Sequence, residues 1–92
     1  MQDSEGVRIF EEKHMISILL FIYENGPSRK MDIYDNVSKN PRMPDKIEKL
    51  EENGLLYTEP DPEGKATVLI HLTPKGITAS QTLIGLDRLI RE

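Results

Sequence analysis

The hydrophobic period of this 92-residue chain changes at Gly54, and that change limits what the chain can fold into. Up to Gly54, apolar residues recur every three or four positions, as they do along one face of a helix. Between Leu55 and Leu72 they alternate, as in half-buried strands, on either side of a turn rich in Pro, Asp and Gly. Helical spacing returns after Thr73. We therefore expect a mainly α fold (an α+β arrangement) with a small β-hairpin before the last helix.

The breaks between these segments carry residues that stop or start helices. The run Asn25–Pro27 (Asn-Gly-Pro) ends the first helix, because Gly and Asn suit the left-handed end of a helix and Pro cannot continue one. Thr73 is a suitable cap for the last helix, and Pro74 fits its first position. The expected elements are, in chain order, helix 10–25, helix 28–38, helix 42–53, hairpin 55–72 and helix 73–91. Residues 1–9 are expected to be flexible, and the whole chain, 1–92, is expected to be a single domain.

The composition excludes several classes of protein. The chain has no cysteine, which removes disulfide frameworks, thiol chemistry and cysteine-based zinc sites. It has 16 acidic and 12 basic residues and a net charge of -4, so any contact with nucleic acid needs a local basic patch. The longest apolar run, Met15–Tyr23, is shorter than the roughly 20 residues of a membrane span, and the acidic start is unlike a secretory signal. We expect a cytoplasmic protein that does not enter a membrane.

Residues able to carry catalysis or bind metals have no suitable spacing. The two histidines, His14 and His71, are too far apart in the sequence to form a metal-ligand pair by spacing. The run Thr73–Gly76 lacks the glycine loop that precedes the lysine of a phosphate-binding loop. No nucleophile has a base at a recognisable distance. We predict a protein that is not an enzyme and that uses no metal or cofactor.

Three segments are similar to parts of one family of regulators. Ile47–Leu56 resembles the end of the recognition helix and the start of the wing in winged helix-turn-helix transcription regulators. Ile70–Gly76 resembles the end of that wing and the start of the closing helix, and Tyr23–Ser28 resembles the junction between the first two helices. Over about residues 10 to 80 the chain is similar to small prokaryotic regulators of the MarR and PadR kind and to archaeal single-domain relatives. The resemblance implies a winged helix-turn-helix in the order helix-helix-helix-strand-strand-helix. It also implies a transcription regulator that binds double-stranded DNA with its third helix in the major groove.

The third helix sorts its charges onto separate faces. At about 100° per residue, Lys46, Lys49 and Asn53 fall on one narrow stripe, which Arg42 would extend. The acidic residues of this helix fall on the far flank, and they are Asp45, Glu48, Glu51 and Glu52. We expect this lysine stripe (Lys46, Lys49 and Asn53) to face DNA, with its lysines on phosphates. The alternative is that the lysines form only solvated pairs within the helix, such as Asp45 with Lys49.

Further DNA contacts are expected from the start of the second helix, from the turn before the third helix and from the wing tip. A helix start offers free N–H groups to a phosphate. The predicted DNA-contacting residues are Ser28, Arg29, Lys30, Lys39, Asn40, Arg42, Lys46, Lys49, Asn53 and Lys65. At the wing tip Asp61 and Glu63 nearly cancel the charge of Lys65. The alternative for the basic residues outside the third helix is that they only keep the surface soluble.

The first and last helices are apolar on more sides than one small domain can cover. In the last helix, Ile77 and Ile84 point nearly opposite to the stripe that contains Leu83 and Leu86. We expect a homodimer built from the terminal helices, which would hold two recognition helices for two half-sites. The predicted interface residues are Phe10, Ile18, Phe21, Ile77, Ile84, Leu86, Leu89 and Ile90. The alternative is that both faces are ordinary core or a tolerated exposed patch.

Two functions remain open from the sequence. The first is a homodimeric DNA-binding transcription regulator, which the sorted lysines favour. The second is a winged-helix module that binds protein in a larger transcription or replication assembly. It is favoured by the acidic total and by Asn40–Pro44, where the resemblance implies hydroxyl-bearing residues. No residue indicates an operator sequence or a small-molecule effector.

Overall fold

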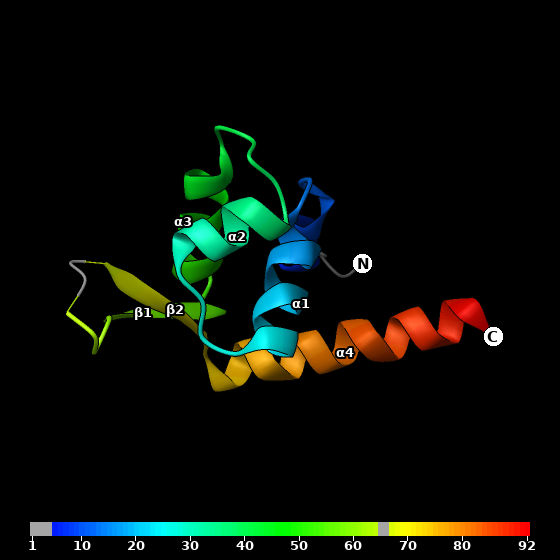
Figure 1. The fold of residues 1–92 in the computed structure, drawn as a ribbon. Coiled ribbons are helices and arrows are strands. Elements are labelled where there is room, and N and C mark those ends of the chain that lie inside the picture. The colour runs from blue at the N-terminus through cyan, green and yellow to red at the C-terminus, as the bar shows by residue number, and fades with distance from the viewer. Residues whose placement is uncertain (1–4, 65–66) are drawn as a thin grey trace.

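In the computed structural model, which describes residues 5–64 and 67–92, helices and one β-hairpin follow one another as the sequence predicts (Figure 1). The elements are the short 3-10 helix η1 (Val7–Glu11), α1 (Met15–Asn25), α2 (Lys30–Asn36), α3 (Met43–Glu52), β1 (Leu56–Pro60), β2 (Val68–Leu72) and α4 (Pro74–Arg91). The predicted order of three helices, two strands and a last helix is confirmed.

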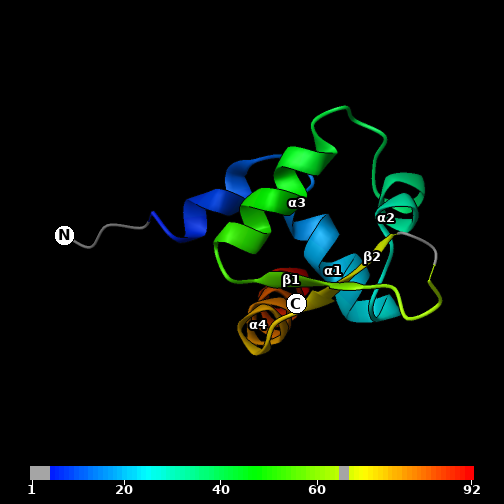
Figure 2. The same cartoon turned by 90° about the vertical axis from the view of Figure 1, so that its left-hand side faces the viewer.

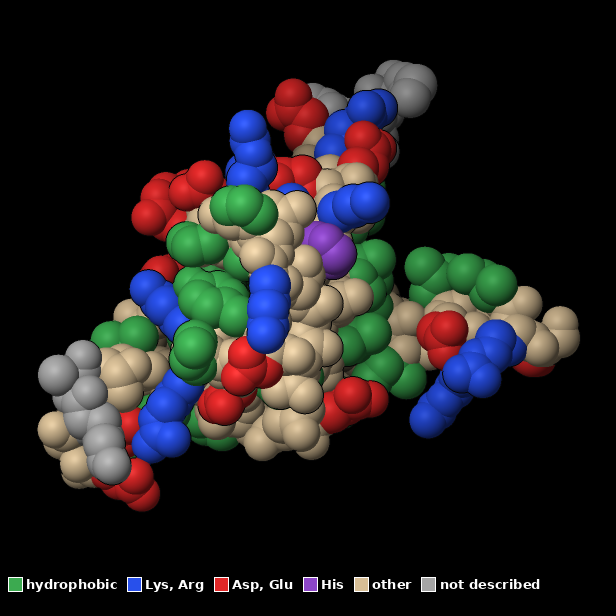
Figure 3. Space-filling model, turned by 45° about the horizontal axis from the view of Figure 1, so that its top comes forward, with side chains coloured by type: hydrophobic (Ala, Val, Ile, Leu, Met, Phe, Trp, Pro, Cys, Tyr) green, Lys and Arg blue, Asp and Glu red, His purple; other side chains and the backbone are tan. Residues whose placement is uncertain are grey.

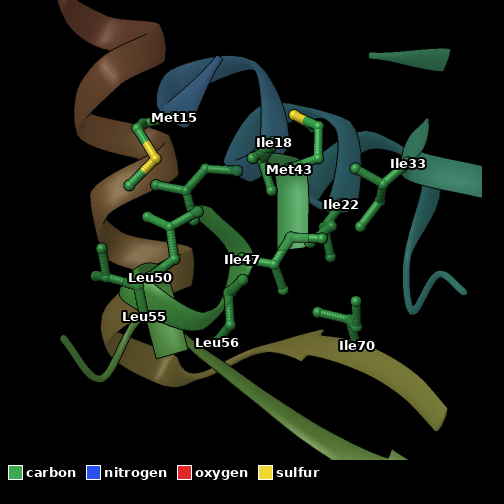
Figure 4. Close-up of a cluster of buried hydrophobic side chains, with 11 residues drawn as sticks. Met15, Ile18, Ile22, Ile33, Met43, Ile47, Leu50, Leu55, Leu56 and Ile70 are labelled. Atoms are coloured by element: carbon green, nitrogen blue, oxygen red, sulfur yellow. The ribbon is translucent and has the colours of Figure 1, made fainter. Parts of the chain in front are cut away.

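α1 forms the centre of the molecule, because it is apolar nearly all round and is covered on several sides. It contacts η1, α3, β2 and α4. Its Met15, Ile18 and Leu19 are completely buried, and apolar side chains of the other elements close around this helix (Figure 4). The core comprises Met15, Ile18, Leu19, Ile22, Ile33, Met43, Ile47, Leu50, Leu55, Leu56 and Ile70. Each of these side chains contributes roughly 1.5–3 kcal/mol on leaving water, so the cluster holds α2, α3 and the hairpin on α1.

The hairpin is fixed by backbone pairing and by a close contact at its base. β1 and β2 pair antiparallel, starting with Leu56 opposite Leu72. At Gly76, in the first turn of α4, a Cβ would lie 2.1 Å from the carbonyl oxygen of Leu55, a distance that no larger residue tolerates. Thr73 is the predicted cap, since its Oγ1 accepts the Gly76 N–H at 2.9 Å. The first turn of α4 therefore packs directly on the junction between α3 and β1.

The sequence pattern predicts that the first helix begins at residue 10, but α1 begins at Met15. His14 has a φ of 72°, and this left-handed conformation prevents the helix from extending further toward the N-terminus. The preceding residues form η1, with Ile9 and Phe10 partly buried against the core. Part of the 1–9 stretch that was expected to be flexible is therefore a turn of 3-10 helix, and residues 1–4 lie outside the described residues.

The predicted start of the second helix is residue 28, but α2 begins at Lys30. Ser28 is paired instead with Ile70 of β2: its N–H donates to the Ile70 carbonyl oxygen at 3.0 Å, and the Ile70 N–H donates back at 2.8 Å. The Ser28 side chain is buried and donates to the Gly26 carbonyl oxygen. The chain entering α2 is therefore attached to the hairpin. The predicted DNA contact by Ser28 is wrong, because this residue is only 3% exposed.

Candidate nucleic-acid interface

The predicted DNA contacts lie on α2, on α3, on the turn between them and on the hairpin. Figure 2 shows α3 in front of α1, the hairpin below α3, and α2 beside the outer part of the hairpin. α3 contacts β1, and α2 contacts β2. Lys65, the predicted contact at the wing tip, lies outside the described residues.

The two lysines of the lysine stripe share one acidic partner. The Glu12 carboxylate, between η1 and α1, lies 3.4 Å from Lys46 Nζ through Oε1 and pairs with Lys49 Nζ through Oε2. The Lys46 side chain is only 9% exposed, whereas that of Lys49 is half exposed. The hydrogen bond from Lys49, and the charges of both lysines, hold the pKa of Glu12 below its ordinary value of 4.5.

This pairing corrects the central expectation for α3. Lys46 is buried beneath the segment that precedes α1, so it is not an open phosphate contact in this conformation. Lys49 reaches solvent but is paired with a residue far away in the sequence, and not with Asp45 as in the alternative considered above. A helical wheel could not reveal this, because it shows only neighbours on the same helix. Asn53 is exposed, and its side-chain amide donates to the Lys49 carbonyl oxygen at 2.8 Å.

The exposed surface of α3 carries mostly acidic side chains. Four carboxylates reach solvent there, and they are Asp45, Glu48, Glu51 and Glu52. Glu51 also accepts a long hydrogen bond of 3.4 Å from the Thr58 hydroxyl on β1. Because phosphates repel carboxylates, the middle and the end of α3 are a poor surface for the DNA backbone.

Arg29 connects the start of α2 to the hairpin tip. Its guanidinium lies 2.7 Å from Asp61 Oδ2 through Nη2 and 3.2 Å from Glu63 Oε1. The Asp61 side chain is only 1% exposed and also accepts the Glu63 N–H through Oδ1 at 2.9 Å. The hydrogen bond and the charge of Asp61 raise the pKa of Arg29 above its ordinary value. Arg29, predicted to contact DNA, is therefore engaged in fixing the hairpin.

Three predicted cations remain exposed, and they lie at the start of α2 and around the turn before α3. Lys30 and Arg42 form no ion pair within residues 5–64 and 67–92, and Lys39 has only a loose exposed pair, with its Nζ 3.8 Å from an Asp35 carboxylate oxygen. Asn40, also in this turn, is exposed and accepts the Arg42 N–H through its side-chain oxygen at 2.8 Å.

These cations flank a partly apolar surface centred on Met31 and Tyr34. One groove of about 410 Å³ is lined by Lys30 together with these two residues, and a neighbouring groove of about 330 Å³ by the same two residues together with Lys39 and Asn40. The Met31 side chain is among the most exposed apolar groups of the molecule. Figure 3 shows Lys and Arg side chains on both sides of a hydrophobic patch, with acidic side chains gathered nearby.

A separate apolar groove of about 850 Å³ lies between α1 and the outer half of α4. Its lining includes Ile16, Leu20, Ile84, Leu86 and Ile90. α4 extends beyond the rest of the molecule, and its outer half leaves apolar side chains in solvent (Figure 1). The groove lies between the first and last helices, from which we expect a homodimer to be built.

The predicted interface residues do not all belong to this groove. Ile18 is wrong, because it is completely buried in the core of its own domain. Phe10 and Phe21 are partly buried against that core. Ile77 is exposed but lines a different cleft, beside Tyr23 at the start of α4. The residues that fit an interface are Ile84, Leu86, Leu89 and Ile90.

His71 makes its ring and ion-pair contacts within the hairpin. His71 stacks on Tyr57, its partner across the hairpin, with ring centroids 4.8 Å apart, and its Nε2 lies 3.0 Å from Glu59 Oε1. Within the part of the chain that the structure describes, no three His, Asp or Glu side chains come together as a metal site. In the same part of the chain, no helix is both long enough and apolar enough to cross a membrane.

Comparison with known proteins agrees with this architecture. Among the solved structures that are similar is a mutant of ZitR from Lactococcus lactis, with a TM-score of 0.72 and 18% sequence identity; the match covers 86% of this chain and 55% of that one. AbfR with its disulfide formed matches with a TM-score of 0.64 and 20% identity, over 88% of this chain and 57% of that one. Reduced AbfR bound to DNA matches with a TM-score of 0.63 and 20% identity, over 87% of this chain and 60% of that one. The chain thus spans little more than half the length of these structures. No curated protein sequence matches it. Residues 13–76, which contain α1 to β2 and the start of α4, match the family model described as a winged helix DNA-binding domain. The chain belongs to this family of winged helix DNA-binding domains.

Proposed function

We propose that this protein is a homodimeric transcription regulator that binds double-stranded DNA with its helix-turn-helix. The observation that carries the proposal is the group of exposed cations Lys30, Lys39 and Arg42 at the start of α2 and around the turn before α3. In a helix-turn-helix these are positions from which side chains reach phosphates and the major groove. A related fold was solved as reduced AbfR bound to DNA, which is in keeping with this use of the domain.

The mode of binding follows from the charges. The first turn of α3 approaches the major groove, so that Arg42 reaches a base edge or a phosphate, while Lys30 and Lys39 contact phosphates. The exposed acids further along α3 disfavour contact between the rest of that helix and the DNA backbone. With about three phosphate contacts per protomer, log affinity falls with log salt at a slope of about -3 per protomer, and binding is modest at physiological salt.

The dimer forms through the groove between α1 and α4. A second copy of α4 is the occupant that fits it, because the exposed side chains Leu86, Leu89 and Ile90 lie at 50%, 65% and 72% exposure on the same helix that lines the groove. Residues of both charge signs, such as Asp87 and Arg88, also line it, so two copies related by a two-fold axis can pair them. A stable dimer buries about 800 Å² per partner, and such a dimer presents two helix-turn-helix units to one stretch of DNA.

The test measures DNA binding by fluorescence anisotropy from about 50 to about 200 mM salt. The variant Lys30→Gln, Lys39→Gln, Arg42→Gln should bind at least tenfold more weakly than the wild type, with a slope about 3 units shallower per protomer. The matched control is Lys13→Gln, an exposed lysine on the segment between η1 and α1, which should bind within about twofold of the wild type. Equal binding by the triple variant and the wild type would show that these cations do not carry the function.

A second candidate is a winged-helix module that binds protein, and the observation that favours it is the exposed acidic surface of α3. That surface would accept a basic partner through the same charges that oppose DNA. If the wild type has no affinity for duplex DNA even at about 50 mM salt, this reading replaces the first.

A further inference from the structure

We propose that the segment Val7–Glu12, here called the N-terminal strap, is a built-in competitor of DNA, in which the Glu12 carboxylate occupies the place that a phosphate takes on Lys49 when DNA binds. The inference rests on the proposed function and concerns the regulation of the same interface. Residues 7–12 would then hold the free protein in a low-affinity state.

The geometry of the contact is that of one anion between two cations. Glu12 Oε1 lies 3.4 Å from Lys46 Nζ, and Oε2 pairs with Lys49 Nζ on the next turn of α3. The Lys49 side chain is 49% exposed and that of Glu12 is 39% exposed, so the pair is open to solvent on one side. A phosphate oxygen has the same charge-assisted interaction with an ammonium group as a carboxylate oxygen, so it can replace Glu12 without leaving Lys49 unpaired.

Lys49 is also where an additional DNA contact would matter most. The other charged residues exposed on α3 are acids, so a lysine released from Glu12 would add the only positive side chain to the exposed part of this helix within the described residues. Lys46, at 9% exposure, stays beneath the strap and is better suited to hold Glu12 in place than to reach DNA.

The strap is held by few and weak backbone contacts. The Glu12 N–H donates to the Ile9 carbonyl oxygen at 3.4 Å, and the Met15 N–H donates to the Glu12 carbonyl oxygen at 3.5 Å, both near the limit for a hydrogen bond. η1 contains no fully buried residue, and its apolar contact with the core is limited to the partly buried Ile9 and Phe10. His14 connects the strap to α1 in a left-handed conformation that is unfavourable for a residue other than glycine. A segment with these features opens at low free-energy cost, as regulatory segments do.

The experiment compares Glu12→Gln with Glu11→Gln by the same anisotropy titration on the full chain. Both variants remove one negative charge from the strap, but among the described residues Glu11 pairs only with Arg8, at 4.0 Å and exposed. We expect Glu12→Gln to bind duplex DNA about threefold or more tighter than the wild type at about 50 mM salt, because DNA no longer has to displace a carboxylate from Lys49. Glu11→Gln should stay within about twofold of the wild type.

A second variant shows whether the gain passes through Lys49. Glu12→Gln combined with Lys49→Gln should lose the gain in affinity, because the contact between Lys49 and DNA no longer exists. Circular dichroism confirms that each variant is folded. If Glu12→Gln leaves the fold incomplete, Glu12→Asp, which keeps the charge but shortens the side chain, should give a smaller gain in the same direction.

The outcomes separate this inference from the proposed function. If the wild type, Glu11→Gln and Glu12→Gln all bind DNA equally, the inference is overturned and the proposed function stands. If Glu12→Gln binds duplex DNA about threefold or more tighter than a wild type that also binds it, both are supported. If none of the three proteins binds at about 50 mM salt, the proposed function fails and the inference fails with it.

Discussion

The packing of α4 on the junction between α3 and β1 can be tested with the same substitution at two glycines of one helix. At Gly76 a Cβ would lie 2.1 Å from the carbonyl oxygen of Leu55 and 3.2 Å from Cδ2 of Leu72, whereas at Gly85 nothing lies within 4 Å. Real Cβ contacts essentially never fall below 3.0 Å, so Gly76→Ala forces the first turn of α4 away from the junction by nearly an ångström.

The change in the free energy of unfolding should have opposite signs at the two glycines. Replacing glycine by alanine within a helix favours folding by about 0.8–1 kcal/mol. At Gly76 this gain is exceeded by overpacking, which costs about 3 kcal/mol, the upper end of the usual range of about 1–3 kcal/mol, because the close neighbour is a backbone carbonyl. We expect Gly76→Ala to lower the free energy of unfolding by about 2 kcal/mol, and Gly85→Ala to raise it by about 1 kcal/mol.

The assay is thermal unfolding followed by circular dichroism at one fixed protein concentration. For a domain of this size, 1 kcal/mol corresponds to a change in Tm of about 4–8 °C, so Gly76→Ala should melt about 8–16 °C below the wild type and Gly85→Ala about 4–8 °C above it. A Gly76→Ala protein that melts at or above the wild-type Tm would refute the close approach of α4 to Leu55.

Three further predictions concern the partner surface, the strap and the hairpin tip. Ile90→Glu, in the groove between α1 and α4, should give a monomer in sedimentation equilibrium. Thr82→Glu, exposed on the same helix but outside the groove, should leave the dimer intact. A dimeric Ile90→Glu protein would contradict the assignment of the groove to the dimer interface. Because Lys49 and Lys46 hold the pKa of Glu12 below 4.5, its carboxylate stabilises the fold above about pH 4.5, and this stabilisation is lost as the pH falls through the lowered pKa. The difference in Tm between the wild type and Glu12→Gln should therefore be full at about pH 7 and vanish in strong acid, and a constant difference would argue against the pairing. Asp61→Asn, which removes the buried charge that holds Arg29, should speed hydrogen exchange of the backbone amides at the hairpin tip, and unchanged exchange would show that this pair does not fix the tip.

The fold could be predicted because its determinants are local. The change of period at Gly54 separates the helices from the hairpin, and the cap at Thr73 marks the last helix. The start of α1 was missed because Ile9 and Phe10 continue the apolar pattern of that helix, although they belong to η1. Nothing in the local pattern indicates the left-handed turn at His14, where α1 begins.

The candidate interface could be predicted only in part, because its charges are paired over long sequence distances. The wheel correctly separated the lysines from the acids of α3, but it could not show that Glu12 covers the lysines. The Asp61 side chain that engages Arg29 likewise comes from the hairpin. Within residues 5–64 and 67–92, Lys30 and Arg42 stay exposed and form no ion pair. Net charge and helical position do not carry that information.

The most direct test of the account maps the DNA-binding surface by backbone amide chemical shifts, with a duplex of about two helical turns added at about 50 mM salt. We predict that the largest shifts fall on residues 29–31 and 39–44, with smaller shifts along the strap as Glu12 leaves Lys49, and none in the groove between α1 and α4. Shifts confined to that groove, or no shifts at all, would contradict the claim that the start of α2 and the first turn of α3 receive DNA.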